Sequence, residues 1–284
     1  MGYELSVKND NGEVLNLSRN DNYIVYKMTG LTPPKVTINS SVNTTQDGST
    51  INSTRIENRN LVIYIAIEGD IEANRIKLYK YFPPKKTVSI YFSNDSREVY
   101  IDGTVELIEC DLFSNKQVAQ ISIICPQPYF KAVDMLITSF SDLNPLFEFP
   151  FSIASSGVEF STIITNVRKS IINTGDAETG IIIELFAAGG EVVNPIIYDV
   201  FKRTKMKLNF TLLQSDLIRI NTNVGEKSIE LIRNGVTTNA MGYMSQDSTW
   251  LQLSAGDNVF TCDTDSGGAD LQITFKTTTL YSGV

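Results

Sequence analysis

The chain has 284 residues, which is enough for one large domain or two of ordinary size. Its formal net charge of −8 argues against general nucleic-acid binding, because that function needs a basic surface. Histidine is absent, which excludes Ser-His-Asp and Cys-His nucleophiles, histidine-ligated metal sites and the most common general base.

Membrane and export signals are not found in the sequence. No segment approaches the roughly 20 continuous apolar residues of a membrane-spanning helix. Residues 1–13 are polar where a signal peptide has its apolar core. We therefore expect a protein that is made and folds in the cytoplasm, without membrane insertion. Its cysteines, Cys110, Cys125 and Cys262, are far apart in apolar runs, and we expect buried free thiols.

Short runs of β-branched and aromatic residues predict a mainly β fold. Turn-forming Asn-Gly, Asp-Gly and Gly-Gly pairs lie between the runs, which is typical of sandwiches and barrels. The clearest runs lie at residues 61–67, 87–92, 120–125, 180–186 and 271–276.

One α-helix is predicted in the first half, at about residues 70–82. Asp70 is suited to cap its N-terminus, Glu72 lies in the first turn, and Pro83-Pro84 ends it. We expect four apolar residues to face a sheet: Ile71, Ile76, Tyr79 and Phe82.

The strand pattern breaks after Cys125, where two prolines within three residues stiffen the exit from a strand. A proline-punctuated link follows at residues 141–157. We therefore predict two β-rich domains, residues 1–140 with the helix and residues 141–284.

The stretch GEKS at residues 225–228 is similar to part of a phosphate-binding loop. That loop has the pattern GxxxxGK[ST] and opens a helix. Here Ile220 occupies the position of the first glycine, and Glu226 separates Gly225 from Lys227. The residues that follow alternate with the period of two that is typical of a strand, up to the turn-forming pair Asn234-Gly235. The sequence therefore predicts no helix N-terminus here that could bind an anion. We interpret the stretch as a strand between two turns.

Two further loops carry polar residues without completing a site. Asp263, Asp265 and Asp270 lie near glycines, but a calcium-binding EF-hand loop needs flanking helices and a final glutamate. Asn194-Pro195 is similar to part of a galectin sugar-binding strand whose histidine and arginine are missing here.

The remaining candidates for chemistry have ordinary structural interpretations. Trp250, the one tryptophan, is predicted to be core or half-buried. The basic stretch Lys77–Lys86 is predicted to be a solvated face. Four acids cluster without the spacing of a glycosidase pair: Asp102, Glu106, Glu109 and Asp111. The sequence therefore identifies no catalytic, cofactor-binding or metal-binding residue.

The order of several stretches carries a family resemblance. The first half has YFPPKKTVSIYF at residues 81–92 and then REVYIDGTVELIECDLFSNKQVAQISIICPQPYF at residues 97–130. The second half has Asn173 with Gly175, the Asn-Pro pair, DLIRINTN at residues 216–223 and WLQLSAGDN at residues 250–258. In this order the stretches resemble the distal tail protein (Dit) family of long-tailed bacteriophages and prophages of Gram-positive hosts.

The resemblance implies a β-rich N-terminal domain that builds a homo-hexameric ring at the tail tip, and a galectin-like C-terminal β-sandwich. It implies a non-enzymatic hub that joins the tail tube to the tail-associated lysin or fibre and to receptor-binding proteins, without a cofactor. The expected location is the virion tail tip. The polar segment at residues 44–60 has no obvious intramolecular partner, and we expect residues 40–60 to pair with the neighbouring subunit.

Two other classes of function stay open at this point. The alternative is a carbohydrate-binding β-sandwich that recognises host cell-wall polysaccharide through an exposed Trp250 or Tyr243. A β-fold polysaccharide hydrolase or lyase is the third class, and it requires a carboxylate or tyrosine whose substitution abolishes turnover.

Overall fold

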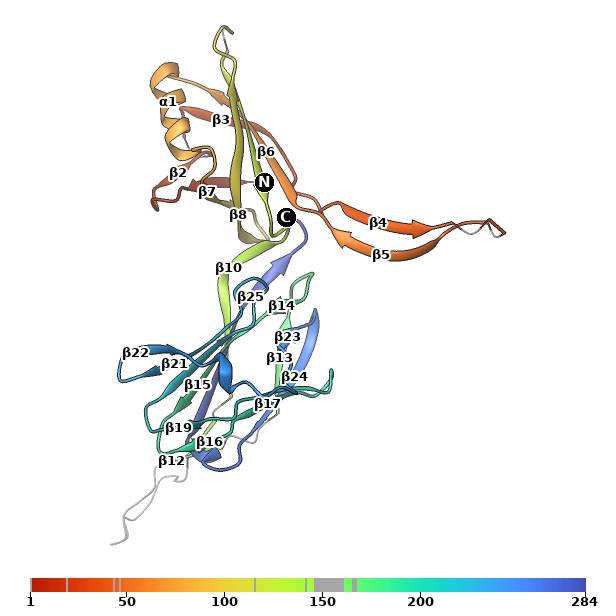
Figure 1. The fold of residues 1–284 in the computed structure, drawn as a ribbon. Helices are drawn as coiled ribbons and strands as arrows, with labels where there is room; N and C mark the ends of the chain where they lie inside the picture. Colours follow the sequence, from red (N-terminus) through yellow and green to blue (C-terminus); the bar gives the residue numbers. More distant parts are fainter. Residues whose placement is uncertain are drawn as a thin grey trace. The chain divides into compact units, whose positions relative to one another are not determined.

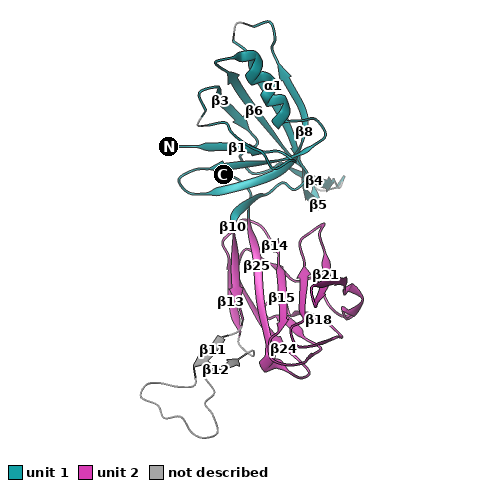
Figure 2. Cartoon of the chain, turned by 90° about the vertical axis from the view of Figure 1, so that its left-hand side faces the viewer, with its two compact units in different colours: residues 1–133, 280–284 teal, residues 134–279 magenta. Residues whose placement is uncertain are grey.

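The computed structural model describes residues 2–18, 20–42, 44–45, 47–114, 116–140, 142–145, 161–164 and 168–284. They form two compact units, one of residues 1–133 with 280–284 and the other of residues 134–279 (Figure 2). The proline-punctuated link predicted at residues 141–157 lies largely outside the described residues. The predicted domain boundary after residue 140 stays a prediction.

The first unit is a curled antiparallel sheet with one helix (Figure 1). Its strands pair in the order β2-β1-β7-β8-β9-β6-β3. The elements are β1 (Glu4–Lys8), β2 (Val14–Asn16), β3 (Tyr23–Thr29), β4 (Val36–Ser41), β5 (Thr50–Ile56), β6 (Arg59–Ile67), α1 (Ile71–Tyr81), β7 (Thr87–Ser93), β8 (Glu98–Cys110) and β9 (Val118–Cys125). Alternate residues of these strands, such as Leu61, Ile63 and Ile65 of β6, are buried in one core.

Helix α1 confirms the predicted helix and its cap. The Asp70 side chain accepts a hydrogen bond from the Ala73 amide at 3.2 Å, and the helix ends before Pro83. The predicted inner face is partly wrong, because Leu78 is buried whereas Ile76 and Tyr79 are exposed. With 3.6 residues per turn, positions 71, 74, 78 and 82 form one stripe, and positions 76 and 79 lie off it.

Strands β10 (Phe130–Ser139) and β25 (Leu271–Tyr281) carry the chain between the units. The second unit also contains β11 (Asp142–Pro145), β12 (Ser161–Ile164), β13 (Lys169–Asn173), β14 (Thr179–Gly180), β15 (Ile182–Ala187), β16 (Val192–Val193), β17 (Ile196–Asp199), β18 (Thr204–Lys207), β19 (Thr211–Leu212), β20 (Leu217–Asn221), β21 (Ser228–Arg233), β22 (Val236–Asn239), η1 (Met241–Tyr243), β23 (Gln252–Leu253), β24 (Gly256–Asp263) and η2 (Gly268–Asp270).

The second unit is a β-sandwich. One sheet has the order β25-β15-β20-β21-β22 and the other has the order β13-β24-β17-β18. Inward residues of both sheets share one core, for example Leu185 from the first and Phe260 from the second. The predicted fold class, mainly β with one α-helix and a C-terminal sandwich, is thus confirmed for the described residues. None of the helices in the described part of the chain is long and apolar enough to cross a membrane.

Candidate protein interface

The first unit carries an exposed hairpin of β4 and β5, residues 36–41 and 50–56, which we call the arm (Figure 1). The sequence prediction that residues 44–60 lack an intramolecular partner is wrong, because residues 50–56 pair with β4 from Val36↔Ile56 to Ser41↔Thr50. The pairing of these two strands is hard to predict from the sequence. Its register shifts at a bulge between Asn39 and Ser40, and no local sequence pattern indicates that bulge.

The arm has two chemically different faces. Directly paired residues point to the same side of a hairpin and alternate along each strand. Val36, Ile38, Ile51 and Ile56 therefore share one face, and their side chains are between 38% and 60% exposed. The other face carries the hydroxyl, amide and guanidinium groups of Thr37, Asn39, Ser41, Ser53 and Arg55. The arm is thus amphipathic rather than uniformly polar.

A two-stranded hairpin of this kind is not expected to be stable on its own. An isolated two-stranded hairpin is marginally stable in water, because it has no core on either face. Residues of both strands of the arm are exposed almost throughout. Its apolar face is therefore suited to be covered by a protein surface.

The root of the arm is anchored by Arg59, which is only 3% exposed. Its guanidinium donates hydrogen bonds to the Gly30 and Thr32 carbonyls, the latter at 2.7 Å. It also donates to the Pro128 carbonyl at 2.6 Å, and it lies over the Phe130 ring at 4.5 Å. Burial lowers the pKa of Arg59 from its usual value. One buried cation thus fixes the loop between β3 and the arm.

Residues at the C-terminal end complete this anchor. Arg59 donates to the Ser282 carbonyl at 2.7 Å. Arg97 donates to the Gly283 carbonyl at 2.5 Å and lies 4.2 Å from the centre of the Tyr281 ring. The Val284 amide donates to the Leu31 carbonyl at 3.1 Å. No local pattern in the sequence predicts this contact, because its partners are far apart along the chain.

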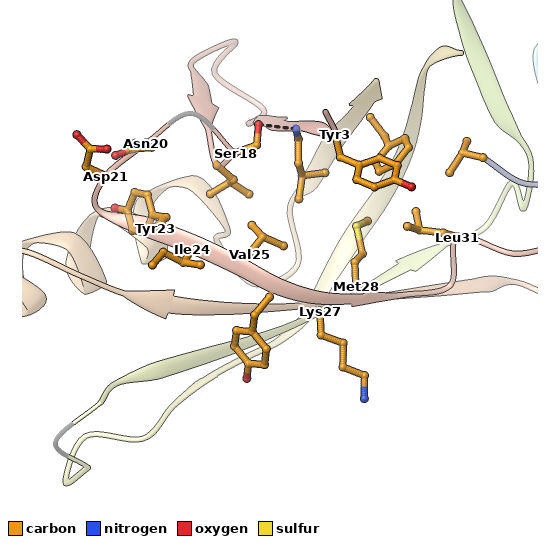
Figure 3. Close-up of a pocket in the computed structure, with 15 residues that line it drawn as sticks. Tyr3, Ser18, Asn20, Asp21, Tyr23, Ile24, Val25, Lys27, Met28 and Leu31 are labelled. Carbon is orange, nitrogen blue, oxygen red and sulfur yellow. Dashed lines mark hydrogen bonds between the residues drawn. The ribbon is translucent and has the colours of Figure 1, made fainter. Parts of the chain in front are cut away.

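An apolar groove lies beside the same root, with a volume of about 840 Å³ (Figure 3). Both edges of the curled sheet contribute to it: Tyr3, Leu5 and Leu17 on one side and residues 23–28 of β3 on the other. In Figure 3, Val25 and Met28 point to the same side of β3 as Tyr3, whereas Lys27 points away. Among the described strands, β3 pairs with β6 only, so its edge toward the groove is open.

The tip of the β8–β9 hairpin is a separate exposed surface of the first unit. Phe113 is 99% exposed and Leu112 beside it is about half exposed. Such an aromatic side chain, fully in water at a loop tip, is typical of an anchor for a partner protein.

The sequence-predicted site residues occupy ordinary structural positions. Residues 222–227 form the turn between β20 and β21, with Gly225 in the left-handed region at φ 86°. Lys227 lies over the Trp250 ring at 5.4 Å, so this lysine packs on an aromatic side chain. Trp250 is half-buried against the core of the sandwich, as predicted from the sequence.

The structure brings together two of the polar loops named from the sequence. The Asn194 amide donates to Asp265 at 2.7 Å, and Lys207 lies 3.7 Å from the same carboxylate. Asp270 lies instead against the backbone of Gly189. Within the described residues, no group of three or more acidic, cysteine or histidine side chains is placed to hold a metal ion.

Two of the acids of β8, Asp102 and Glu106, have separate structural partners. Asp102 accepts from Ser89 at 2.6 Å and from Lys131 at 2.9 Å. Glu106 accepts from Ser122 at 2.8 Å. In the basic stretch at residues 77–86, Lys80 pairs with a glutamate at 2.7 Å and Lys86 with an aspartate at 3.0 Å. This arrangement neutralises part of the basic face.

The three thiols lie in different surroundings. Burial raises the pKa of Cys125 and of Cys262 to about 12. Burial also raises the pKa of Cys110, which is half-buried. These thiols are therefore poor nucleophiles at neutral pH.

Comparison with known proteins adds to this geometry. No curated protein sequence matches the chain. Residues 174–278 match the family model described as the C-terminal domain of a siphovirus-type tail component.

The fold is similar to that of several solved structures. One is the Dit protein of phage SPP1, described as a paradigm of the hub adsorption apparatus in phages that infect Gram-positive hosts. Its TM-score is 0.71 at 13% identity, over 97% of this chain and 98% of that chain.

Two others are chains of the phage P2 baseplate in its activated conformation. The calcium form has a TM-score of 0.56 at 12% identity over 100% of both chains. The strontium form has a TM-score of 0.53 at 12% identity over 97% of both. The predicted resemblance to the distal tail protein family is therefore confirmed: residues 174–278 match the siphovirus-type tail component C-terminal domain, and the fold is similar to that of the SPP1 Dit protein.

Proposed function

We propose that this protein is a non-catalytic structural hub of a phage or prophage tail tip. The observation that carries the proposal is the family match of residues 174–278 together with a Dit-like fold over 97% of the chain. In this role the first unit forms a homo-hexameric ring. The ring joins the tail tube to the tail-associated lysin or fibre, and the second unit lies near receptor-binding proteins. The protein is made in the bacterial cytoplasm and acts in the virion.

The surfaces of the first unit support self-association. The arm has an uncovered apolar face, and β3 has an open edge beside an apolar groove. These are two different surfaces, and contacts between different surfaces of identical copies generate rings or filaments. The number six rests on the family resemblance.

A structural role also agrees with the environment of the acidic residues. Asp102 and Glu106 each accept hydrogen bonds from neighbours on the sheet. Both carboxylates thus stabilise the sheet through contacts with neighbouring side chains.

Imaging and immunolabelling test this proposal. Negative-stain electron microscopy of the purified chain, alone and with its neighbouring tail proteins, is expected to show six-fold rings. Antibody against the chain is expected to label the tip of intact tails. Labelling along the tube or on the capsid, or a single copy under all these conditions, would contradict the proposal.

Carbohydrate binding by the second unit is a second candidate, and one observation favours it. Tyr243 is 44% exposed and packs against Phe210 at 4.5 Å between ring centroids, with Arg233 5.8 Å from the Phe210 ring. Exposed aromatic rings beside a charged group are typical of sugar platforms. Fluorescence titration with wall teichoic acid and oligosaccharides tests it, with Tyr243→Ala as the control. A titration without response would eliminate this candidate.

A further inference from the structure

We infer that Asn234 is a site of spontaneous covalent modification, at which the side-chain amide is converted to aspartate and isoaspartate. The sequence contains two Asn-Gly pairs, Asn11-Gly12 and Asn234-Gly235. A glycine after asparagine favours this reaction, because no Cβ atom shields its amide nitrogen. The two pairs lie in different surroundings, and only those of Asn234 leave the reaction open. This inference does not depend on the proposed function.

The reaction uses the atoms of the chain and water. The Gly235 amide nitrogen loses its proton to hydroxide and attacks the Cγ atom of Asn234. The new N–C bond closes a succinimide ring, and the side-chain nitrogen takes up a proton and leaves as ammonia. Water then opens the ring at one of its two carbonyls. Opening at the side-chain carbonyl gives aspartate, and opening at the main-chain carbonyl gives isoaspartate, in which the backbone runs through the former side chain.

The turn at Asn234-Gly235 holds neither reacting group in a hydrogen bond. Both residues are exposed, with positive φ of 51° and 77°. They connect Arg233 to Val236, the last pair of the ladder between β21 and β22. Among the described residues, neither the Gly235 amide nor the Asn234 side chain has a hydrogen-bond partner. The nitrogen that must lose its proton therefore faces water.

The hairpin that carries this turn can also open locally. Strand β22 is at an edge of its sheet and, within the described part of the chain, pairs with β21 alone, from Glu230↔Asn239 to Arg233↔Val236. All of its residues are exposed. Exposed segments of this kind open at a small cost in free energy. Opening lets the backbone of Asn234 turn toward the geometry of ring closure.

The other Asn-Gly pair is held by several hydrogen bonds. The Gly12 amide donates to the Asn9 carbonyl at 3.0 Å. Asn9 is only 4% exposed, and its side chain accepts from the amides of Asn11 and Glu13 at 3.2 Å and 2.9 Å. Glu13 accepts in turn from Lys80 at 2.7 Å. These bonds keep the proton on the Gly12 nitrogen and restrict rotation around Asn11, so we expect this pair to react more slowly.

The modification would change the edge of the sandwich. Both products carry a carboxylate where the asparagine was neutral, and isoaspartate adds a methylene group to the backbone of the turn. A two-residue turn of this kind needs positive φ at both positions and fixes the strand register. The longer backbone of isoaspartate is therefore expected to break the Arg233↔Val236 pair, and amide hydrogen exchange of residues 236–239 should accelerate in the modified chain.

Peptide mapping tests the assignment. The whole chain is incubated at pH 8, samples are digested at mildly acidic pH, where the reaction is slow, and electron-transfer fragmentation identifies isoaspartate. The peptide that contains Asn234 is expected to be modified several-fold faster than the peptide that contains Asn11. Asn234→Gly keeps a residue suited to positive φ but has no side-chain amide, so its peptide is expected to show no modification at that position.

Two controls separate the effect of the fold from that of the sequence. In concentrated urea both pairs lose their surroundings, and their rates are expected to become similar. Asn9→Ala removes the side chain that holds the Asn11 turn and is expected to raise the rate at Asn11 several-fold, with no change at Asn234. Equal rates in the folded chain, or faster reaction at Asn11, would overturn the inference. A difference that persists unchanged in urea would overturn it too, because the folded surroundings would then not be its cause.

Discussion

Arg59→Leu tests whether one buried cation holds the first unit together. The substitution keeps an apolar side chain against Phe130 but removes four hydrogen bonds to carbonyls. A hydrogen bond from a charged donor contributes about 1.5–3 kcal/mol, and the cost of burying the guanidinium offsets part of the sum. We therefore expect a loss of about 3 kcal/mol, because four partly buried carbonyls are left without their donor.

Thermal and urea unfolding measure this loss. For a unit of this size, about 3 kcal/mol corresponds to a decrease in Tm of about 10 °C. Arg55→Leu is the matched control, because Arg55 is exposed on the arm, and we expect a change within about 0.5 kcal/mol. Amide hydrogen exchange of residues 280–284 is expected to accelerate in Arg59→Leu only. A stability equal to that of the unmodified chain would refute the reasoning that these carbonyls depend on Arg59.

Three further substitutions and labels test separate parts of the structure. Gly103→Ala should destabilise the first unit by about 1–3 kcal/mol in urea unfolding, since its Cβ would lie 2.8 Å from the Cys125 Sγ atom. The hydrogen bond from Arg233 lowers the pKa of Asp216 in the folded state, so its stabilising contribution is present above about pH 4 and is lost as the pH falls through the folded pKa. Asp216→Asn should flatten that acid limb of the stability curve. Iodoacetamide at pH 8 should modify Cys110 before Cys125, and equal rates would contradict the burial of Cys125.

Local signals in the sequence predicted the elements that depend on neighbouring residues. Asp70 and Pro83 bound helix α1 because capping and the missing proline amide act within one turn. The Asn234-Gly235 pair ends β21 because both residues adopt positive φ there. The inner face of the helix was predicted less well, because Ile76 and Leu78 are equally apolar and only the sheet beneath them decides which is buried.

Contacts between distant residues could not be predicted in this way. The segment at residues 40–60 was singled out correctly as unusual, but its pairing with β4 depends on a bulge. The anchor of Arg59 depends on carbonyls from three other parts of the chain, including Ser282. A carbonyl carries no side-chain signature, so the sequence does not show which ones will surround a buried arginine. The groove likewise exists only once the sheet has curled.

The stiffness of the arm's root bears on the geometry of the proposed ring, because the root sets the direction in which the arm leaves the sheet. A contact between two different surfaces of identical copies, repeated by one rotation, gives a closed ring or an open filament. An open series leaves one surface of each kind uncovered, whereas a ring leaves neither. The angle set by Arg59 and Pro33-Pro34 determines whether the rotation closes. Arg59→Lys keeps the charge but cannot reach all four carbonyls, because an ammonium lacks the planar fork of a guanidinium. We therefore expect mass photometry of Arg59→Lys to show assemblies of mixed size, whereas the unmodified chain gives rings of one size. Rings of one size from Arg59→Lys would show that the root does not set the angle of closure.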